Sequence, residues 1–267
     1  MSTPLDKVFE KVRAENRAAL IAYIPAGFPS QAGCAKAIQA LAAAGVDAIE
    51  IGYPYSDPVM DGPTIQEAAE ISLKGGTSAA DVFSALKVAS ATGVAAVVMT
   101  YWNPIEIYGV DAFAQAIAQN GGSGVITPDL TIEESGRWLE ATNKHGINPI
   151  YVVAPSTSNA RLAQVTSKTS GFVYAASVMG VTGARSDISV DASALVARVK
   201  ESTKLPVAVG LGVSTGAQAK QVAAYADGVI VGSAFIKLLL SAESEQAGLD
   251  AISALAKELA LGVREGR

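Results

Sequence analysis

The chain has 267 residues, of which 50% are hydrophobic, and a formal net charge of −5 without any basic run, so it can bury a large core and does not suit nucleic acid. Its single cysteine, Cys34, excludes an internal disulfide and a cysteine metal cluster, and its place in an alanine-rich stretch indicates a packing role. No apolar segment is long enough to span a bilayer, and the charged first turns lack the apolar core of a signal peptide, so we expect a cytoplasmic protein.

The first predicted element is a helix that begins with Thr3 as N-cap and Pro4 at its first position. Short apolar strands then alternate with helices. Strands are predicted at Ala19–Ile24, Asp47–Ile51, Val94–Met99, Gly124–Ile126, Ile147–Val153, Phe172–Ala175, Pro206–Val209 and Val229–Val231. Helices are predicted at Gln31–Ala44, Gly62–Lys74, Ala79–Ala91, Val110–Asn120, Ile132–Lys144, Asn159–Lys168, Asp191–Glu201, Gly216–Tyr225 and Glu243–Gly262, with a short one after Gly232-Ser233.

Eight strand–helix units of similar length predict an α/β fold, a closed (β/α)₈ or TIM barrel whose bottom is covered by the extra N-terminal helix. An open doubly wound sheet is the rival architecture. The length is close to the roughly 250 residues that are typical of such barrels. No linker or low-complexity tract interrupts the chain, so residues 1–267 are predicted to form one domain.

Two glycine turns near the end of the chain predict a phosphate site. Gly232-Ser233 follows the last apolar strand and opens a short helix, whose free backbone N–H groups suit a phosphate dianion. Gly210-Leu211-Gly212 follows the strand before it. In barrel enzymes the phosphate site is commonly built after the seventh and eighth strands. The alternative is that these glycines only make tight turns.

Two acidic residues in the stretch from Asp47 to Gln66 are the candidates for chemistry. If Ile49 and Ile51 face the surrounding helices, then Glu50 points into the barrel mouth, where its charged form is disfavoured and it can exchange protons near neutral pH. A solvated glutamate at the strand exit is the alternative. Asp61 either belongs to the N-cap region of the next helix or faces the pocket opposite Glu50.

Motifs spread over nearly the whole chain resemble those of tryptophan synthase alpha subunits. The blocks that carry this resemblance are Asp47–Gly52, Pro54–Pro58, Asp61–Gln66, Tyr101–Pro104, Pro128–Leu130, Tyr174 with Gly180–Arg185, Gly210–Ser214 and Gly232-Ser233. The resemblance implies a lyase of tryptophan biosynthesis that cleaves indole-3-glycerol phosphate to indole and glyceraldehyde 3-phosphate in a retro-aldol reaction.

The resemblance also implies roles for single residues. Glu50 is expected to be the general acid and base, and Asp61 to take the indole N–H and stabilise its positive charge. The remaining expected substrate-binding residues are Tyr174 beside Glu50; Gly183, Gly212, Gly232 and Ser233 at the phosphate; Tyr23, Tyr101, Asp129 and Leu211 at or behind the indole pocket; and Thr182 in a closing loop that orients Asp61.

The residue inventory independently favours acid–base chemistry. None of the predicted strands carries the lysine that a Schiff-base aldolase needs. The only histidine, His145, stands before Gly146 as a helix end would, which leaves no histidine set for a metal. We therefore expect no metal and no cofactor on this chain.

The expected partner is the beta subunit, in an alpha2beta2 heterotetramer, and pyridoxal phosphate is expected only on that subunit. Two other functions remain open from the sequence. One is a different phosphate-binding barrel enzyme, such as an isomerase. The other is a non-enzymatic partner whose role is to activate a beta subunit.

Overall fold

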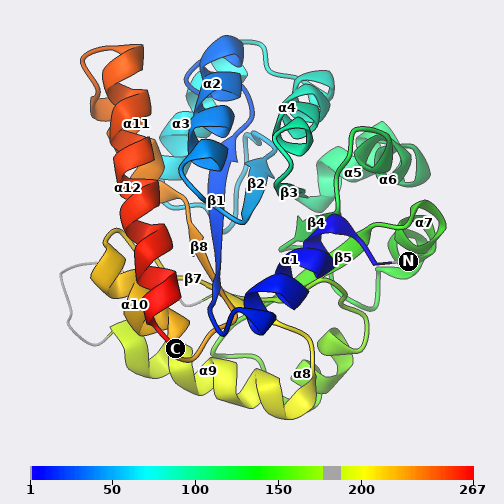
Figure 1. Ribbon diagram of the computed structural model, residues 1–267. Coiled ribbons are helices and arrows are strands. Elements are labelled where there is room, and N and C mark those ends of the chain that lie inside the picture. Colours follow the sequence, from blue (N-terminus) through cyan, green and yellow to red (C-terminus); the bar gives the residue numbers. More distant parts are fainter. Residues whose placement is uncertain (1, 177–187) are drawn as a thin grey trace.

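The computed structural model describes residues 2–176 and 188–267. In this part of the chain, eight parallel strands pair in sequence order, and β8 returns to β1 to close the barrel (Figure 1). The strands are β1 (Ala19–Pro25), β2 (Ala48–Gly52), β3 (Ala95–Met99), β4 (Gly124–Thr127), β5 (Asn148–Val153), β6 (Val173–Ala176), β7 (Val207–Gly210) and β8 (Gly228–Val231). Closure excludes the open sheet, and the (β/α)₈ prediction is confirmed.

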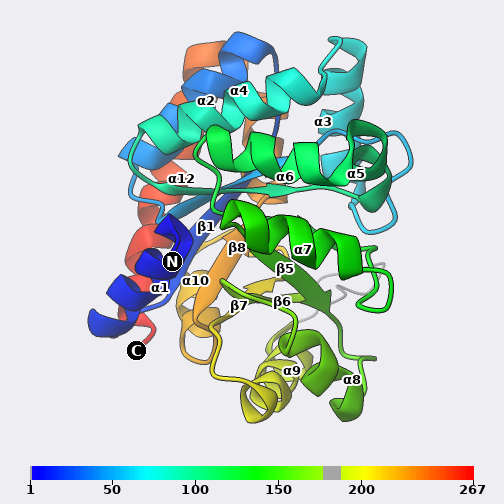
Figure 2. The ribbon, with the colours of Figure 1, turned by 90° about the vertical axis from the view of Figure 1, so that its right-hand side faces the viewer.

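Helices surround the barrel on its outside (Figures 1 and 2). They are α1 (Pro4–Ala14), α2 (Gln31–Ala43), α3 (Pro63–Lys74), α4 (Ala79–Ala91), α5 (Trp102–Tyr108), α6 (Val110–Gln119), α7 (Gly136–His145), α8 (Asn159–Thr166), α9 (Ile188–Ser202), α10 (Gly216–Ala223), α11 (Ser233–Ser241) and α12 (Glu245–Glu265). None of the described helices is long and apolar enough to cross a membrane.

Every predicted strand is confirmed to within one residue at each end, whereas one helix was not predicted and three others differ from their predicted bounds by three or four residues at one end: α7, α9, which begins at Ile188 rather than Asp191, and α12. Helix α5 was not predicted, because its seven residues show too little of the 3.6-residue period. Helix α7 begins at Gly136 rather than Ile132, because residues 131–135 form a turn in which the Ser135 hydroxyl donates to the Ile132 carbonyl.

Helix α12 was predicted to end at Gly262 but continues to Glu265. Gly262 serves close packing instead. A Cβ atom there would lie 2.2 Å from the carbonyl oxygen of Gly216, so the backbones of α10 and α12 touch at this point. A glycine near the end of a helical pattern was thus a contact residue rather than a terminus.

Helix α1 closes the end of the barrel where the strands begin. Thr3 caps it as predicted, with the Thr3 hydroxyl accepting from the Asp6 N–H and the Asp6 carboxylate accepting from the Thr3 N–H. Phe9 packs at the start of β8, where a Cβ at Gly228 would be in ordinary contact with the Phe9 ring at 3.5 Å but would stand only 2.9 Å from the Ala208 Cβ of β7. Phe9 also packs on Phe172, with ring centroids 5.6 Å apart. The predicted cover of the barrel bottom is confirmed.

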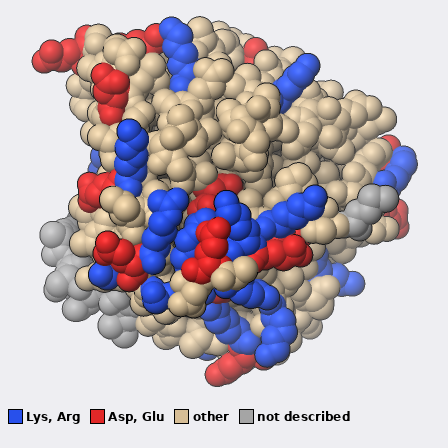
Figure 3. All heavy atoms as spheres, viewed as in Figure 1, with Lys and Arg blue, Asp and Glu red and all other residues tan. Residues whose placement is uncertain are grey.

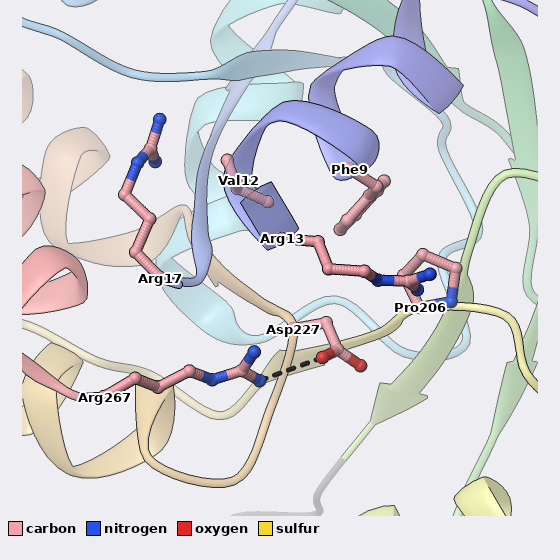
Figure 4. A pocket seen from close by; sticks show the side chains of 7 residues that line it. All are labelled: Phe9, Val12, Arg13, Arg17, Pro206, Asp227 and Arg267. Carbon is pink, nitrogen blue, oxygen red and sulfur yellow. Dashed lines mark hydrogen bonds and ion pairs between the residues drawn. The ribbon is translucent and has the colours of Figure 1, made fainter. Parts of the chain in front are cut away.

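Ion pairs tie the strand ends together at this closed end. The Arg17 guanidinium, only 5% exposed, donates two 2.8 Å hydrogen bonds to Asp47, which also accepts from the Leu20 N–H. Asp227 makes the same kind of contacts: it accepts a hydrogen bond from the Val207 N–H and forms an ion pair with Arg267 (Figure 4). Each aspartate therefore joins its own strand to the neighbouring strand in the barrel.

The cavity shown in Figure 4 lies among these pairs, at the end opposite to the barrel mouth. Its volume is about 10 Å³, enough for roughly one water molecule. On the face shown in Figure 3, the charges around this end alternate in sign, with Lys and Arg interspersed among Asp and Glu. The ion pairs and hydrogen bonds at this end of the barrel stabilise the fold.

We expect Asp47→Ala to destabilise the protein by about 3 kcal/mol, because the buried Arg17 guanidinium loses both hydrogen bonds to Asp47 and keeps only those to Glu15 and the Ala18 carbonyl. Glu245→Ala is the matched control, since it removes an exposed ion pair with Lys36 and should cost less than about 1 kcal/mol. Urea unfolding followed by circular dichroism measures both. Equal effects of the two substitutions would contradict this role of Asp47.

Candidate functional site

Glu50 lies in the middle of β2 and points into the barrel. Its neighbours Ile49 and Ile51 pack in the outer core between the strands and helices, and Ala48 packs in the inner core, as the strand alternation predicted. The side chain is 1% exposed, and its Oε2 atom has no hydrogen-bond partner among the described residues. A solvated glutamate at the strand exit is therefore excluded.

Burial of this carboxyl group changes its acidity. Desolvation, reinforced by the negative charge of Asp61, raises the pKa of Glu50 to about 8. At neutral pH the group is mainly protonated, yet it can lose its proton within the physiological range. Such a group can give a proton to a substrate and take one back.

Asp61 lies at the end of the loop that joins β2 to α3. The N-cap of α3 is Gly62, so Asp61 does not cap the helix with its side chain, and its backbone carbonyl accepts from the Gln66 side chain at 2.8 Å. Burial raises the pKa of Asp61, and the Tyr101 hydroxyl beside it acts in the opposite direction. The charge of Asp61 acts on Glu50, which favours the predicted placement facing the pocket over the one in the helix N-cap region.

Tyr101 connects this loop to the barrel. Its hydroxyl accepts the Met60 N–H at 3.2 Å, directly beside Asp61, and its ring packs on Tyr55 with centroids 5.2 Å apart. Asn103 donates to the Tyr55 hydroxyl at 3.3 Å. The loop that carries Asp61 is thus held by α5, an element that the sequence pattern did not reveal.

Asp129 supports the same arrangement from behind. Both of its carboxylate oxygens accept from the Trp102 N–H, at 2.9 and 3.1 Å, so Asp129 fixes the start of α5 immediately after Tyr101. It also lines a separate cavity of about 170 Å³ beside β5. Of the two roles expected for Asp129, lining the indole pocket or supporting it, these contacts favour support.

Two phenols enter the barrel mouth from different strands. Tyr23 of β1 and Tyr174 of β6 are 7% and 8% exposed. Burial raises the pKa of each well above its usual range, with further contributions from the charges of Glu50 and Asp61. Each ring lies against a glycine, since a Cβ at Gly210 would be 2.3 Å from the Tyr174 oxygen. Both hydroxyls therefore stay protonated beside the two carboxyl groups.

The two glycine turns lie where the sequence predicted them. Gly232 is the N-cap of α11 and Ser233 its first residue, and no side chain among the described residues caps this end. The first N–H groups of a helix have no partner inside the helix, so they are free for an anion. After β7, Leu211 is buried and Gly212 has a positive φ of 74°. Tyr23 lies against Gly232, since a Cβ atom there would be 3.0 Å from the ring carbon Cδ1.

Thr182 and Gly183 lie outside the residues that the structure describes. His145 ends α7 and Gly146 follows in the left-handed conformation, as predicted for a helix end. Cys34 is buried as expected. Within the described ranges, no group of three His, Cys, Asp or Glu residues could hold a metal ion.

The comparisons with known proteins agree on one family. The sequence model described as "Tryptophan synthase alpha chain" matches residues 9–264. The tryptophan synthase alpha chain of Streptomyces avermitilis is 54% identical over 263 residues, which are 98% of this chain and 95% of that protein. The alpha chain of Salinispora arenicola is 55% identical over 256 residues, 96% of each chain.

Solved structures give the same result. A chain in the structure of Mycobacterium tuberculosis tryptophan synthase superposes with a TM-score of 0.91 at 51% identity, covering 99% of both chains. The tryptophan synthase subunit alpha of Legionella pneumophila superposes with a TM-score of 0.89 at 33% identity, covering 98% of this chain and 99% of that one.

We expect Glu50→Gln to stabilise the fold at neutral pH. The pKa of Glu50 is raised to about 8 in the folded protein, so Glu50 costs no stability below the pKa of an unfolded glutamate, near 4.5. As the pH rises from there, the unfolded state releases a proton that the folded state keeps, and wild-type stability falls until about pH 8.

The stability difference between the variant and the wild type should therefore be small at pH 4 and grow to a few kcal/mol at pH 8. Urea unfolding at several pH values measures it. A difference that does not change with pH would contradict the raised pKa of Glu50.

Proposed function

This chain belongs to the tryptophan synthase alpha chain family, and we propose that Glu50 and Asp61 are the acid–base pair of its reaction. The enzyme cleaves indole-3-glycerol phosphate to indole and glyceraldehyde 3-phosphate. The observation that carries the proposal is a buried, unpaired carboxyl group at Glu50, whose pKa is raised to about 8, with a second carboxyl group beside it.

The first step is protonation of the substrate. Protonated Glu50 gives its proton to C3 of the indole ring, and the positive charge that forms is delocalised onto the ring nitrogen. The Asp61 carboxylate accepts the indole N–H and stabilises this charge. Tyr101 holds the loop that carries Asp61, through the Met60 N–H, and so fixes the distance between the two acids.

The second step breaks the carbon–carbon bond. Glu50, now a carboxylate, takes the proton of the hydroxyl group next to the ring, and a carbonyl forms there. The electron pair of the breaking bond flows into the protonated ring and neutralises its nitrogen, which yields indole and glyceraldehyde 3-phosphate. Glu50 ends the cycle protonated, so the proton balance closes on one residue.

Binding is divided among the other predicted residues. We assign the phosphate to the turns at Gly212 and Gly232-Ser233, and the indole pocket to Tyr101, Tyr174 and Leu211. Support comes from the free N–H groups at the start of α11 and from the burial of these side chains at the barrel mouth. The roles expected for Thr182 and Gly183 remain predictions from the sequence.

The chemistry needs only protons and an electron sink, and the indole ring is that sink. We therefore propose that this chain binds neither metal nor cofactor, and that pyridoxal phosphate belongs to the beta subunit. We also propose that residues 1–267 act as one domain, since the pairing of β8 with β1 joins the two halves of the chain. As a biosynthetic enzyme, it is proposed to work in the cytoplasm.

The beta subunit is the partner, in an alpha2beta2 heterotetramer, and we propose that it binds at the barrel mouth. Exposed apolar side chains gather there: Val59 and Met60 are 76% and 37% exposed, and Ile107 and Tyr108 on α5 are 79% and 43% exposed. The loop and α5 are joined by the bond from Asn103 to Tyr55. A partner at this surface can therefore stabilise the position of Asp61.

Neither alternative function has support from the family comparisons. A pure activating partner has no need of a buried acid at Glu50, because an unpaired buried carboxyl group lowers stability. A different barrel enzyme does not account for the match over residues 9–264.

We expect Glu50→Gln to lower the rate of indole release by about 10²–10⁴-fold or more, because the variant keeps the size of the side chain but cannot transfer protons. Glu67→Gln, an exposed residue of α3, is the matched control and should keep the wild-type rate. Turnover is followed by the release of indole from indole-3-glycerol phosphate. Near-normal turnover of Glu50→Gln with an intact fold would contradict the assignment.

Ser233→Asp places a carboxylate where we expect the phosphate dianion, so repulsion should weaken substrate binding about 100-fold or more. Binding of free indole should change little. Calorimetric titration with indole-3-glycerol phosphate, in a Glu50→Gln background that prevents turnover, measures the first effect. If both ligands weaken equally, the turn is structural.

Ile107→Asp should abolish the rise in indole release that a beta subunit causes, because it places a charge in the apolar contact surface, while the basal rate stays unchanged. Leu261→Asp removes a side chain that is 59% exposed and should keep the rise, because Leu261 lies near the end of α12, which is followed by Arg267 bound to Asp227 at the closed end of the barrel. Beta subunit is titrated while glyceraldehyde 3-phosphate is measured. A full response from Ile107→Asp would place the interface elsewhere.

A further inference from the structure

Tyr23 and Glu50 lie side by side on the inner face of the barrel, and Val97 of β3 flanks Glu50 on its other side. Tyr23 and Glu50 are Cα partners across the β1–β2 pair, and both point into the barrel. Gly52 follows two positions after Glu50 on the same face of β2, one layer nearer the mouth. The Tyr23 side chain thus lines the inside of the barrel between Glu50 and the mouth through which a substrate enters.

The Tyr23 ring lies in space that two glycines leave open. A Cβ atom at Gly52 would stand 2.2 Å from the Tyr23 hydroxyl oxygen, and one at Gly232 would stand 3.0 Å from the ring carbon Cδ1. The ring therefore passes by Gly232 and ends with its hydroxyl against Gly52, which is the next inward position after Glu50 on β2. In Figure 1 the strand β1 lies between β8, which Gly232 follows, and β2, which contains Gly52.

The hydroxyl group at the end of this ring is unpaired. It makes no hydrogen bond within residues 2–176 and 188–267. Glu50 Oε2 is a fully enclosed unpaired atom, whereas the Tyr23 hydroxyl is not fully enclosed. Buried tyrosine hydroxyls normally have a partner. Burial, together with the charges of Asp61 and Glu50, raises the pKa of Tyr23, so the group is a hydrogen-bond donor that borders the open mouth.

We propose that the Tyr23 hydroxyl hydrogen-bonds the middle hydroxyl group of the substrate's three-carbon chain and so makes the enzyme selective for hydroxylated substrates. This inference rests on the proposed function. A chain that joins a phosphate at Gly232-Ser233 to an indole ring beside Glu50 runs past Tyr23, which lies against Gly232 and neighbours Glu50 on the adjacent strand. Its middle hydroxyl is the polar group between the phosphate and the carbon that reacts.

The test compares Tyr23→Phe with the wild type on two ligands. One is indole-3-glycerol phosphate, and the other is indole-3-propanol phosphate, which has the same ring, chain and phosphate but no hydroxyl groups. The variant should lose about 10- to 100-fold in kcat/KM for the first ligand, while the inhibition constant of the second stays within about twofold. Tyr225→Phe is the matched control, since Tyr225 also has an unpaired hydroxyl but lies outside the site.

Two results would overturn the inference. If Tyr23→Phe keeps the wild-type kcat/KM, the hydroxyl makes no contact that matters. If both ligands weaken equally, the residue acts through its ring. Circular dichroism and urea unfolding check that the variant is folded. Failure of the proposed function is distinguishable, because then the wild type itself would not release indole.

Discussion

The acid–base chemistry that we propose depends on one carboxyl group that is buried away from water and has an oxygen atom without a hydrogen-bond partner. Glu50 is 1% exposed inside an apolar barrel, and no described residue donates a hydrogen bond to its Oε2 atom. Such a group lowers stability whenever the pH favours its charged form. The same desolvation raises its pKa into the range where one residue can act as acid and then as base. The cost to stability and the reactivity have one physical origin.

The rest of the barrel is arranged to tolerate this cost. At the closed end, Phe9 packs on Phe172, and Arg17 and Asp47 form a buried two-point ion pair that joins neighbouring strands. At the open end lie the buried Glu50 carboxyl group, whose Oε2 atom is unpaired, and the loop that carries Asp61. These stabilising contacts and the proposed reactive groups therefore lie at opposite ends of the barrel axis.

The second acid is positioned from a distance. Asp61 lies on a loop, and its location depends on Tyr101, which depends in turn on the start of α5, held by Asp129. The outer side of the same assembly exposes Val59, Met60 and Ile107. A partner that covers these side chains and a substrate that meets Asp61 therefore act on one connected loop. This gives a physical route by which the beta subunit can affect alpha-subunit turnover.

The sequence by itself determined the barrel, the inward direction of Glu50 and the two glycine turns that follow β7 and β8. Each depends on local patterns: strand alternation, apolar runs ended by glycine, and eight repeats of one unit. Tertiary structure alone decided that the charge of Asp61 acts on Glu50, that Asp129 supports α5, that Gly262 is a contact between helices, and that Tyr23 spans from Gly232 to Gly52. These facts depend on segments far apart in the chain meeting at atomic distances, and a one-dimensional pattern does not contain those distances.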